Sequence, residues 1–246
     1  MTIEQLPSIA ACRLWHVDLD ATPAGQASEC LSEDESARAA HFVFERDRRR
    51  YMAAHIALRQ TLSMVTGTAA GELAFEIGAF GKPALTIPTK VRFNLSHSAG
   101  AGLIAINDCN SDDACELGVD VEVLRPLSYS SALAAEYFTL AEQQGLVATA
   151  PPDRDLAFLT CWTRKEACLK ALGLGLSIDT RSFEVGVRAE STDVVMAVAG
   201  RNATLHVHSF RHRLDLVCAV AKVVVDPTCA GLPALSSSAL IEREFA

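Results

Sequence analysis

Two long segments with helical periodicity dominate this sequence, and similar short segments follow each of them. Apolar residues recur at helical spacing over residues 47–64, and this segment stops at Gly67. A second helical segment covers residues 157–172 and stops at Gly173. Strand-like runs separated by turn signals come after both. One order of elements, repeated roughly 106 to 113 residues later, predicts two related α+β lobes that arose by duplication.

Short matches support this repeat. FEIG at residues 75–78 resembles FEVG at 183–186, and LIAI at 103–106 resembles LVCAV at 216–220. We expect an N-terminal lobe over residues 1–112, a C-terminal lobe over 113–230 and a tail over 231–246. Each lobe should be a long helix packed on a small, mostly antiparallel sheet. The remaining expected elements are strands at 13–19, 75–77, 91–95, 103–106, 117–123, 183–187, 204–210 and 214–225, and helices at 32–41 and 133–146.

Composition excludes several other classes of protein. Of the 246 residues, 50% are hydrophobic and 21% are charged, which is too apolar for a disordered chain. A net charge of −8 disfavours bulk binding to nucleic acid or to an anionic membrane. The N-terminal stretch has no uninterrupted apolar run, so we expect no signal peptide and a cytoplasmic protein. The eight cysteines include no CxxC pair, and we interpret them as free thiols.

The segment LGVDVEV at residues 117–123 places two acids on one side of a predicted strand. Side chains alternate along a strand, so Asp120 and Glu122 share one face and the valines share the other. Neighbouring carboxylates repel each other unless a cation lies between them, and Mg²⁺ suits such oxygen ligands. A half-exposed strand with solvated acids explains the same pattern.

The helical segment CWTRKEACLKALGLGL at residues 161–176 carries a second candidate group. Trp162, Glu166 and Lys170 stand at positions i, i+4 and i+8, so the carboxylate and the ammonium can reach one ligand. An ordinary surface helix would also use a glutamate and a lysine at this spacing. We interpret Trp162 as packing that orients the helix.

A third candidate is a strand end with polar residues. Lys82 follows a turn glycine, and Ser96 and His97 lie near the end of the strand predicted at 91–95. Adjacent strand residues point to opposite faces, which argues against a serine nucleophile activated by His97. Both residues are better placed as donors to a phosphate. A hairpin with a polar end is the competing interpretation.

Charge is distributed unevenly along the chain. Residues 38–59 contain six arginines against Glu45 and Asp47, whereas residues 108–122 contain six acids and no lysine or arginine. A solvated helix face would explain the arginines. Together, the two clusters also fit a polyanionic ligand that arginines hold at one end and a metal ion holds at the other.

In this order, GKP (81–83), FNLSHS (93–98), GVDVE (118–122) and WTRKEACLKALGLGL (162–176) resemble the motifs of the Sfp-type 4′-phosphopantetheinyl transferases. The resemblance spans residues 38–176 and implies that family's pseudo-dimeric fold, with the active site between the lobes. It also implies Mg²⁺-dependent transfer of the 4′-phosphopantetheine arm of coenzyme A to a serine of an acyl, peptidyl or aryl carrier protein. Adenosine 3′,5′-bisphosphate would be released.

The resemblance also assigns roles to residues. It implies that Asp120, Glu122 and Glu166 bind Mg²⁺ or Mn²⁺, that Glu166 is the base for the incoming serine, and that Lys170 stabilises the leaving phosphate with help from Lys165. The coenzyme A phosphates would be held by Lys82, Ser96 and His97, with Arg38 and Arg50 near basic positions of the family. Glu35 departs from the pattern, because some members have a basic residue there.

Two other functions remain open from the sequence. The chain could be a catalytically silent protein that binds coenzyme A, or a Mg²⁺-dependent hydrolase that cleaves the coenzyme A pyrophosphate with water. The carrier proteins could belong to fatty acid, polyketide or nonribosomal peptide synthesis. With both lobes in one chain, we expect a monomer.

Overall fold

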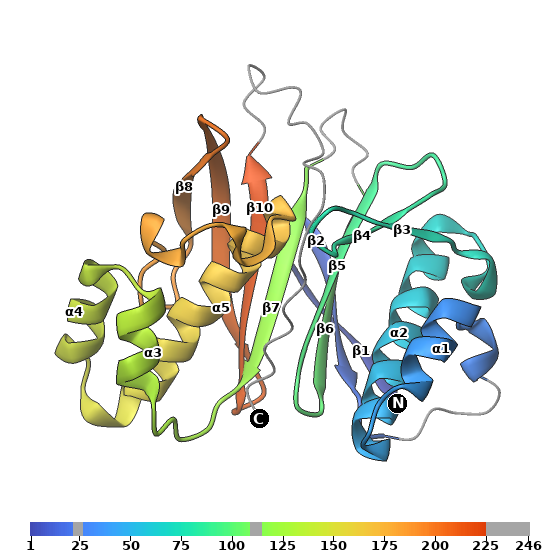
Figure 1. The fold of residues 1–246 in the computed structure, drawn as a ribbon, viewed down its shortest axis with the longest axis horizontal. Helices are drawn as coiled ribbons and strands as arrows, with labels where there is room; N and C mark the ends of the chain where they lie inside the picture. The colour runs from blue at the N-terminus through green and yellow to red at the C-terminus, as the bar shows by residue number, and fades with distance from the viewer. Residues whose placement is uncertain (22–26, 109–114, 225–246) are drawn as a thin grey trace.

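The computed structural model describes residues 1–21, 27–108 and 115–224, and it contains two antiparallel four-stranded sheets (Figure 1). The first sheet has the order β1-β2-β6-β5 and the second has the order β7-β10-β9-β8. A small hairpin of β3 (Phe75–Ile77) and β4 (Pro83–Leu85) accompanies the first sheet. The strands of the two large sheets are β1 (Thr2–Ile9), β2 (Cys12–Asp18), β5 (Val91–Ser98), β6 (Ala101–Asp108), β7 (Leu117–Val123), β8 (Thr192–Val198), β9 (Arg201–His212) and β10 (Leu216–Val224).

The described residues form five α-helices, of which α2 and α5 cover the sheets, and the helix ends follow from local sequence. Ser32 begins α1 with a capping box that includes Glu35, as the sequence predicts. The two long helices, α2 and α5, end at Gly67 and Gly173, whose φ angles of 75° and 64° favour glycine. The helices are α1 (Glu33–Ala40), α2 (Glu45–Thr66), α3 (Ser130–Tyr137), α4 (Leu140–Ala148) and α5 (Arg154–Leu172), with short 3-10 turns η1 (Ala27–Cys30), η2 (Ala70–Glu72), η3 (Pro151–Asp153), η4 (Gly175–Ser177) and η5 (Thr180–Ser182).

The two halves repeat one arrangement, which confirms the predicted α+β pseudo-dimer. In each half a strand precedes the long helix, a hairpin follows it, and the last strand of the hairpin pairs with the first strand: β6 with β2, and β10 with β7. Each sheet then gains one further strand, β1 beside β2 and β8 beside β9. The predicted boundary at residue 112 and the predicted tail at 231–246 lie outside the described residues.

Three hydrophobic cores hold the layers together. One lies between α2 and the first sheet, and another lies between α5 and the second sheet. The third lies between the two sheets and contains Leu14 and Leu103 from the first and Val119 and Val220 from the second. The helices therefore lie on the outer sides of two sheets whose inner faces meet (Figure 1).

Three sequence expectations need correction. The helix expected over 133–146 is two helices, because Phe138 is extended and fully buried and Thr139 begins α4 with its own capping box. The strand expected over 183–187 is absent, and the carbonyl groups of Phe183 and Val185 instead accept hydrogen bonds from side chains of α5. The sequence expectations also omitted β1 and β8.

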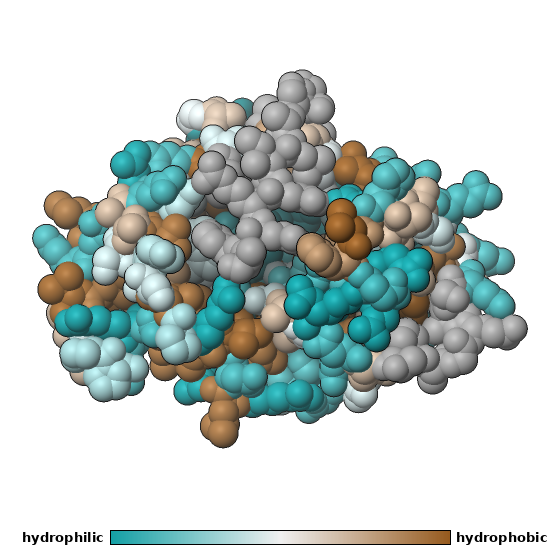
Figure 2. Space-filling view, turned by 60° about the horizontal axis from the view of Figure 1, so that its bottom comes forward, coloured by the Kyte–Doolittle hydropathy of each residue, from teal (hydrophilic) through white to brown (hydrophobic). Residues whose placement is uncertain are grey.

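Within the described residues, no helix is long and apolar enough to cross a bilayer. On the face in Figure 2, hydrophobic residues are interspersed with hydrophilic ones. Six of the eight cysteines lie in the described segments, and Cys161, Cys168 and Cys218 among them are buried thiols.

Candidate active site

The two acids of β7 lie on the face that α5 covers. Val119 and Val121 point into the core between the sheets, as the alternation predicts. Asp120 is only 3% exposed, and Glu122 is half-buried. The alternative of solvated acids on a half-exposed strand is therefore wrong for Asp120. A carboxylate at this depth requires compensating charge or hydrogen bonds.

Three elements meet at Asp120. Lys170 on α5 places its Nζ atom 2.6 Å from Asp120 Oδ1. Ser96 on β5 donates a hydrogen bond of 2.8 Å from its Oγ atom to the same Oδ1, and it accepts one of 2.9 Å from Lys170 Nζ. Residues predicted separately from a strand end, an acidic strand and a helix thus form one connected group.

Side chains of β5 also connect the two sheets at their edge strands, β5 and β7, on both sides of Asp120 along the strand. Asn94 Oδ1 accepts a hydrogen bond of 2.8 Å from the backbone N–H of Val119. Ser98 donates a bond of 2.6 Å from Oγ to Glu122 Oε2. Asn94, Ser96 and Ser98 are alternate residues of β5 and therefore share the face that meets β7. The cluster lies where edge strands of the two lobes meet.

Burial and mutual repulsion raise the pKa values of two acids in the cluster. Burial, with the nearby charge of Asp120, raises the pKa of Glu122 to about 7, although Ser98 and Lys170 oppose this. Burial also raises the pKa of Glu166 to about 7; the charge of Lys170 opposes this rise and that of Asp120 adds to it. Burial alone would lower the pKa of Lys170, but Asp120 and Glu166 reverse this and raise it. Three carboxyl groups thus share one ammonium group.

This excess of negative charge includes one oxygen with no partner. Asp120 Oδ2 is buried and accepts no hydrogen bond. Buried carboxylate oxygens of this kind suit a hard divalent cation, which binds oxygen ligands. Within the described residues, one group of three possible metal ligands has its ligand atoms within 4.8 Å of one another, and it lies elsewhere in the molecule. The carboxylate oxygens of Asp120, Glu122 and Glu166 are therefore farther apart than this in the present structure. Asp120 instead contacts Lys170.

Lys165, predicted to assist catalysis, does not contact this group in the structure. Its side chain is 1% exposed, and Nζ lies 2.9 Å from Glu142 Oε2. The same Nζ donates to the carbonyl groups of Thr180 and Phe183. Lys165 leaves α5 on a different face from Glu166 and Lys170, so it stabilises the interior of the second lobe.

Lys82 is also occupied. Its Nζ atom lies 2.7 Å from Glu116 Oε2 and donates to the carbonyl groups of Leu117 and Ala171 at 3.0 and 2.9 Å. Burial lowers the pKa of Lys82, and Glu116 opposes this. These contacts join the β3–β4 hairpin to β7 and α5, so Lys82 has a structural role in this structure, and its contact with a coenzyme A phosphate stays a prediction.

The remaining basic candidates lie on the first lobe. Arg50 on α2 forms two hydrogen bonds of 2.7 Å with the two carboxylate oxygens of Asp20. The guanidinium of Arg38 lies 5.8 Å from the centre of the Tyr51 ring. Tyr51 directly follows Arg50 on α2. His97 is exposed on β5, between Ser96 and Ser98. Glu35 binds His55 and Arg59 within the lobe, which accounts for an acid at this position.

Comparison with known proteins covers both lobes. Residues 21–108 match the family model of the 4′-phosphopantetheinyl transferase N-terminal domain, and residues 116–221 match that of the 4′-phosphopantetheinyl transferase superfamily. The 4′-phosphopantetheinyl transferase HetI of Nostoc sp. strain PCC 7120 is 36% identical over 170 residues, which cover 67% of this chain and 69% of HetI. The chain belongs to the 4′-phosphopantetheinyl transferase family.

Two further relatives extend this result, and both are named 4′-phosphopantetheinyl transferases. Psf-1 of Bacillus pumilus is 28% identical over 158 residues, which cover 64% of each protein. Sfp of Bacillus subtilis strain 168 is 25% identical over 155 residues, which cover 63% of this chain and 66% of Sfp. This chain is therefore a transferase of the Sfp type, as its motifs predict.

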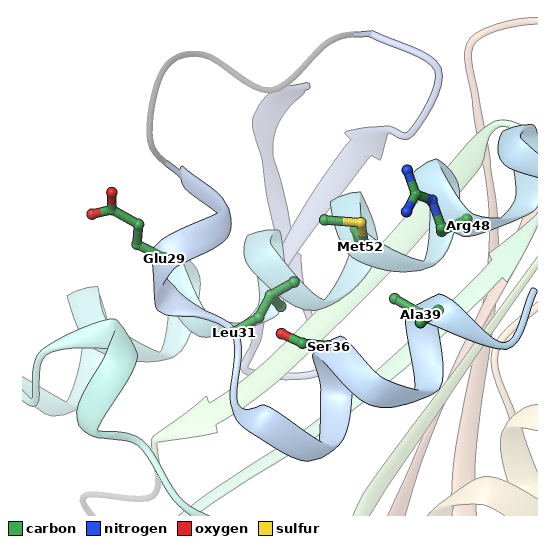
Figure 3. A pocket seen from close by; sticks show the side chains of 7 residues that line it. Glu29, Leu31, Ser36, Ala39, Arg48 and Met52 are labelled. Atoms are coloured by element: carbon green, nitrogen blue, oxygen red, sulfur yellow. The ribbon is translucent and has the colours of Figure 1, made fainter.

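We call Asp120, Glu122 and Glu166 the acid cluster. All three acids lie in the part of this phosphopantetheinyl transferase that matches the superfamily model. A separate cavity of about 340 Å³ lies between η1, α1 and α2, and Figure 3 shows it. Its lining includes Leu31, Arg48 and Met52 but none of the predicted site residues. The cavity is therefore not the centre of the transfer reaction.

Sequence reasoning missed several residues that position the site. Asn94 and Ser98 escaped notice although they alternate with Ser96, and this alternation was the available signal. Asp20 escaped because its partner Arg50 lies 30 residues away. Gly118 lies in the GVDVE motif, but the sequence alone indicates no physical role for it. In the structure α5 packs so closely on β7 at this position that a Cβ atom would clash with its backbone.

Proposed function

We propose that this transferase moves the 4′-phosphopantetheine arm of coenzyme A to a serine hydroxyl of an acyl, peptidyl or aryl carrier protein. The observation that carries the proposal is the buried group of Asp120, Glu122 and Glu166 beside Lys170, with one carboxylate oxygen lacking any partner. Such a group concentrates negative charge at the junction of the two lobes. A cation bound there would offset the charge of these carboxylates and of a pyrophosphate.

In the proposed reaction, the carrier serine oxygen forms a bond to the phosphorus that bears the pantetheine arm. The bond from that phosphorus to the bridging oxygen of the pyrophosphate breaks, and adenosine 3′,5′-bisphosphate leaves. No nucleophile of this chain is needed, because the attacking hydroxyl belongs to the carrier.

Three groups of the chain take part. Glu166 takes the serine proton directly or through water. Lys170, whose pKa is raised, remains protonated and stabilises the leaving phosphate. Ser96 positions Lys170 and Asp120 relative to each other through its two hydrogen bonds.

Asp120, Glu122 and Glu166 are the residues that would hold Mg²⁺ or Mn²⁺, which would neutralise the charge of the pyrophosphate. We assign the coenzyme A phosphates to Arg38, Arg50 and His97 on the first lobe. Ser96 contributes at most indirectly, since its hydroxyl already bonds Asp120 and Lys170.

We further propose a monomer that works in the cytoplasm. Both lobes of one chain contribute to the cluster, so a second copy is not required. Cys161, Cys168 and Cys218 are buried thiols, and a reducing compartment keeps such thiols intact.

The test is intact-mass spectrometry of apo carrier proteins of all three kinds, incubated with the enzyme, coenzyme A and Mg²⁺. We expect one carrier to gain roughly 340 Da, the mass of the arm, and EDTA to abolish the gain. Asp120→Asn and Glu166→Gln should each abolish transfer while the fold is retained. Asp193→Asn is the matched control, because Asp193 is exposed and pairs with His206 on the second sheet.

Near-native turnover of Asp120→Asn or Glu166→Gln would refute the metal assignment. Coenzyme A that binds without labelling any carrier would indicate a silent binding protein. Coenzyme A cleavage without labelling would indicate a hydrolase.

A further inference from the structure

A group of one carboxylate and two imidazoles joins the two sheets away from the acid cluster. Glu4 on β1 and His16 on β2 are direct cross-strand partners in the first sheet. His212 at the end of β9 belongs to the second sheet and reaches the same point. Residues far apart in sequence, from two lobes, thus place ligand-type side chains together.

The distances are close to those of a metal site. His212 Nε2 lies 3.5 Å and His16 Nδ1 lies 3.9 Å from Glu4 Oε2. One ligand atom from each residue lies within 4.8 Å of the other two. Tetrahedral Zn²⁺ with bonds near 2.0 Å keeps its nitrogen and oxygen ligands roughly 3.3 Å apart. A small side-chain movement would therefore reach coordination geometry.

One nitrogen of this group lacks a hydrogen-bond partner, and the two imidazoles lie close together. His212 Nε2 is buried and makes no hydrogen bond. His16 has a side chain that is 4% exposed, and its ring centre lies 4.7 Å from that of His212. The imidazole nitrogen is a common ligand of transition-metal ions.

A neighbouring cation competes for the carboxylate. Arg213 Nη2 lies 3.7 Å from Glu4 Oε2, but the Arg213 side chain is 52% exposed. An exposed ion pair of this length contributes little stability, so a metal ion can displace the guanidinium. Arg213 therefore offers a variant that should strengthen metal binding.

The group is separate from the acid cluster. His16 pairs with Leu103, and Leu103 pairs with Ser96, so two strand spacings, about 10 Å, lie between His16 and Ser96. We propose that Glu4, His16 and His212 bind one transition-metal ion of the zinc class, with water as the fourth ligand. The ion fastens β1 and β2 of the first lobe to β9 of the second and stabilises the interface on which the acid cluster depends.

The test uses the full chain without an affinity tag, stripped with EDTA and then kept in excess Mg²⁺ to occupy carboxylate sites. Zn²⁺ is titrated against a chromophoric chelator, and Co²⁺ is added separately as a spectroscopic probe. We expect one equivalent to bind, an intense visible Co²⁺ absorption typical of tetrahedral coordination, and a rise in Tm. Strong near-ultraviolet charge transfer would instead identify a cysteine ligand and overturn the proposal.

Variants separate this site from others. Glu4→Gln and His212→Gln should each weaken Zn²⁺ binding at least about tenfold. Arg213→Gln should tighten it, and because Arg213 is exposed this variant tests the site even if His212→Gln folds poorly. His206→Gln, a partly exposed histidine on the same strand, and Asp120→Asn should leave binding unchanged. Absence of Zn²⁺ binding, or binding that neither Glu4→Gln nor Arg213→Gln alters, would overturn the proposal.

Discussion

Arg50 on α2 is proposed to bind a phosphate of coenzyme A, yet its guanidinium already holds a carboxylate. Asp20 forms hydrogen bonds of 2.7 Å with both Nε and Nη2 of Arg50. The bond from Arg50 holds the pKa of Asp20 below its usual value, so Asp20 is charged at neutral pH. A phosphate that binds Arg50 must compete with this carboxylate.

Variants of this pair should therefore change the KM for coenzyme A in opposite directions. Arg50→Ala should raise it more than the KM for 3′-dephospho-coenzyme A. Asp20→Asn should lower the KM for coenzyme A by about two- to fivefold, because an exposed pair contributes less than about 1 kcal/mol. Steady-state kinetics with both substrates measures these effects.

Arg48→Ala is the matched control on the same helix, since Arg48 pairs with Glu45 at 2.9 Å. Equal changes for both substrates in Arg50→Ala would remove Arg50 from the 3′-phosphate site. An unchanged KM in Asp20→Asn would show that the carboxylate does not compete.

At the scale of elements, the site depends on how closely α5 packs on β7. A Cβ atom at Gly118 would lie 2.2 Å from the carbonyl oxygen of Ala167 and 2.3 Å from the backbone nitrogen of Ala171. Only glycine permits this approach, and it brings Lys170 to 2.6 Å from Asp120. The glycine that opens the GVDVE motif thus sets the position of α5 relative to Asp120.

Gly118→Ala should push α5 away from β7. We expect a loss of about 3 kcal/mol or more in the free energy of unfolding, because the clash is with rigid backbone, and a fall in kcat at temperatures where the variant is folded. Urea denaturation and carrier-labelling rates measure the two effects. Gly67→Ala should cost only about 1 kcal/mol, since a Cβ there meets no atom within 4 Å and the strain comes from a φ of 75° alone. Equal costs for the two variants would contradict this packing argument.

The same scale shows which elements the sequence could predict. Sequence patterns predicted α2 and α5, which both stop at a glycine, and β7, in which valines alternate with acids although both of its faces are covered. They failed at 183–187, where the backbone of Phe183 and Val185 bonds to buried Lys165 and Arg164 instead of to a strand. Such contacts between distant residues leave no local pattern. For this reason the sequence also could not distinguish Lys165, which is buried, from Lys170, which faces the cluster.

At the scale of the whole molecule, polar contacts set the lobes relative to each other beside the hydrophobic core between the sheets. Lys82 from the first lobe bonds Glu116, Leu117 and Ala171 in the second. Arg92 on β5 adds a contact of 2.8 Å to Glu116. These bonds lie at the start of β7 and the end of α5, the two elements that carry the acid cluster. The position of the cluster thus depends on the contact between lobes.

Lys82→Met should weaken this contact and remove the donor of the buried Leu117 and Ala171 carbonyl groups, while Glu116 keeps its contact with Arg92. We expect a loss of about 2–3 kcal/mol in the free energy of unfolding without coenzyme A, since buried acceptors lose their partner. KM should rise similarly for coenzyme A and for 3′-dephospho-coenzyme A, because the cleft changes shape while no phosphate contact is removed. Lys90→Met, at an exposed lysine of the same lobe, is the control. If Lys82 instead binds a phosphate, Lys82→Met would leave stability unchanged and raise the KM for coenzyme A alone. Denaturation without ligand and steady-state kinetics with both substrates distinguish the two outcomes.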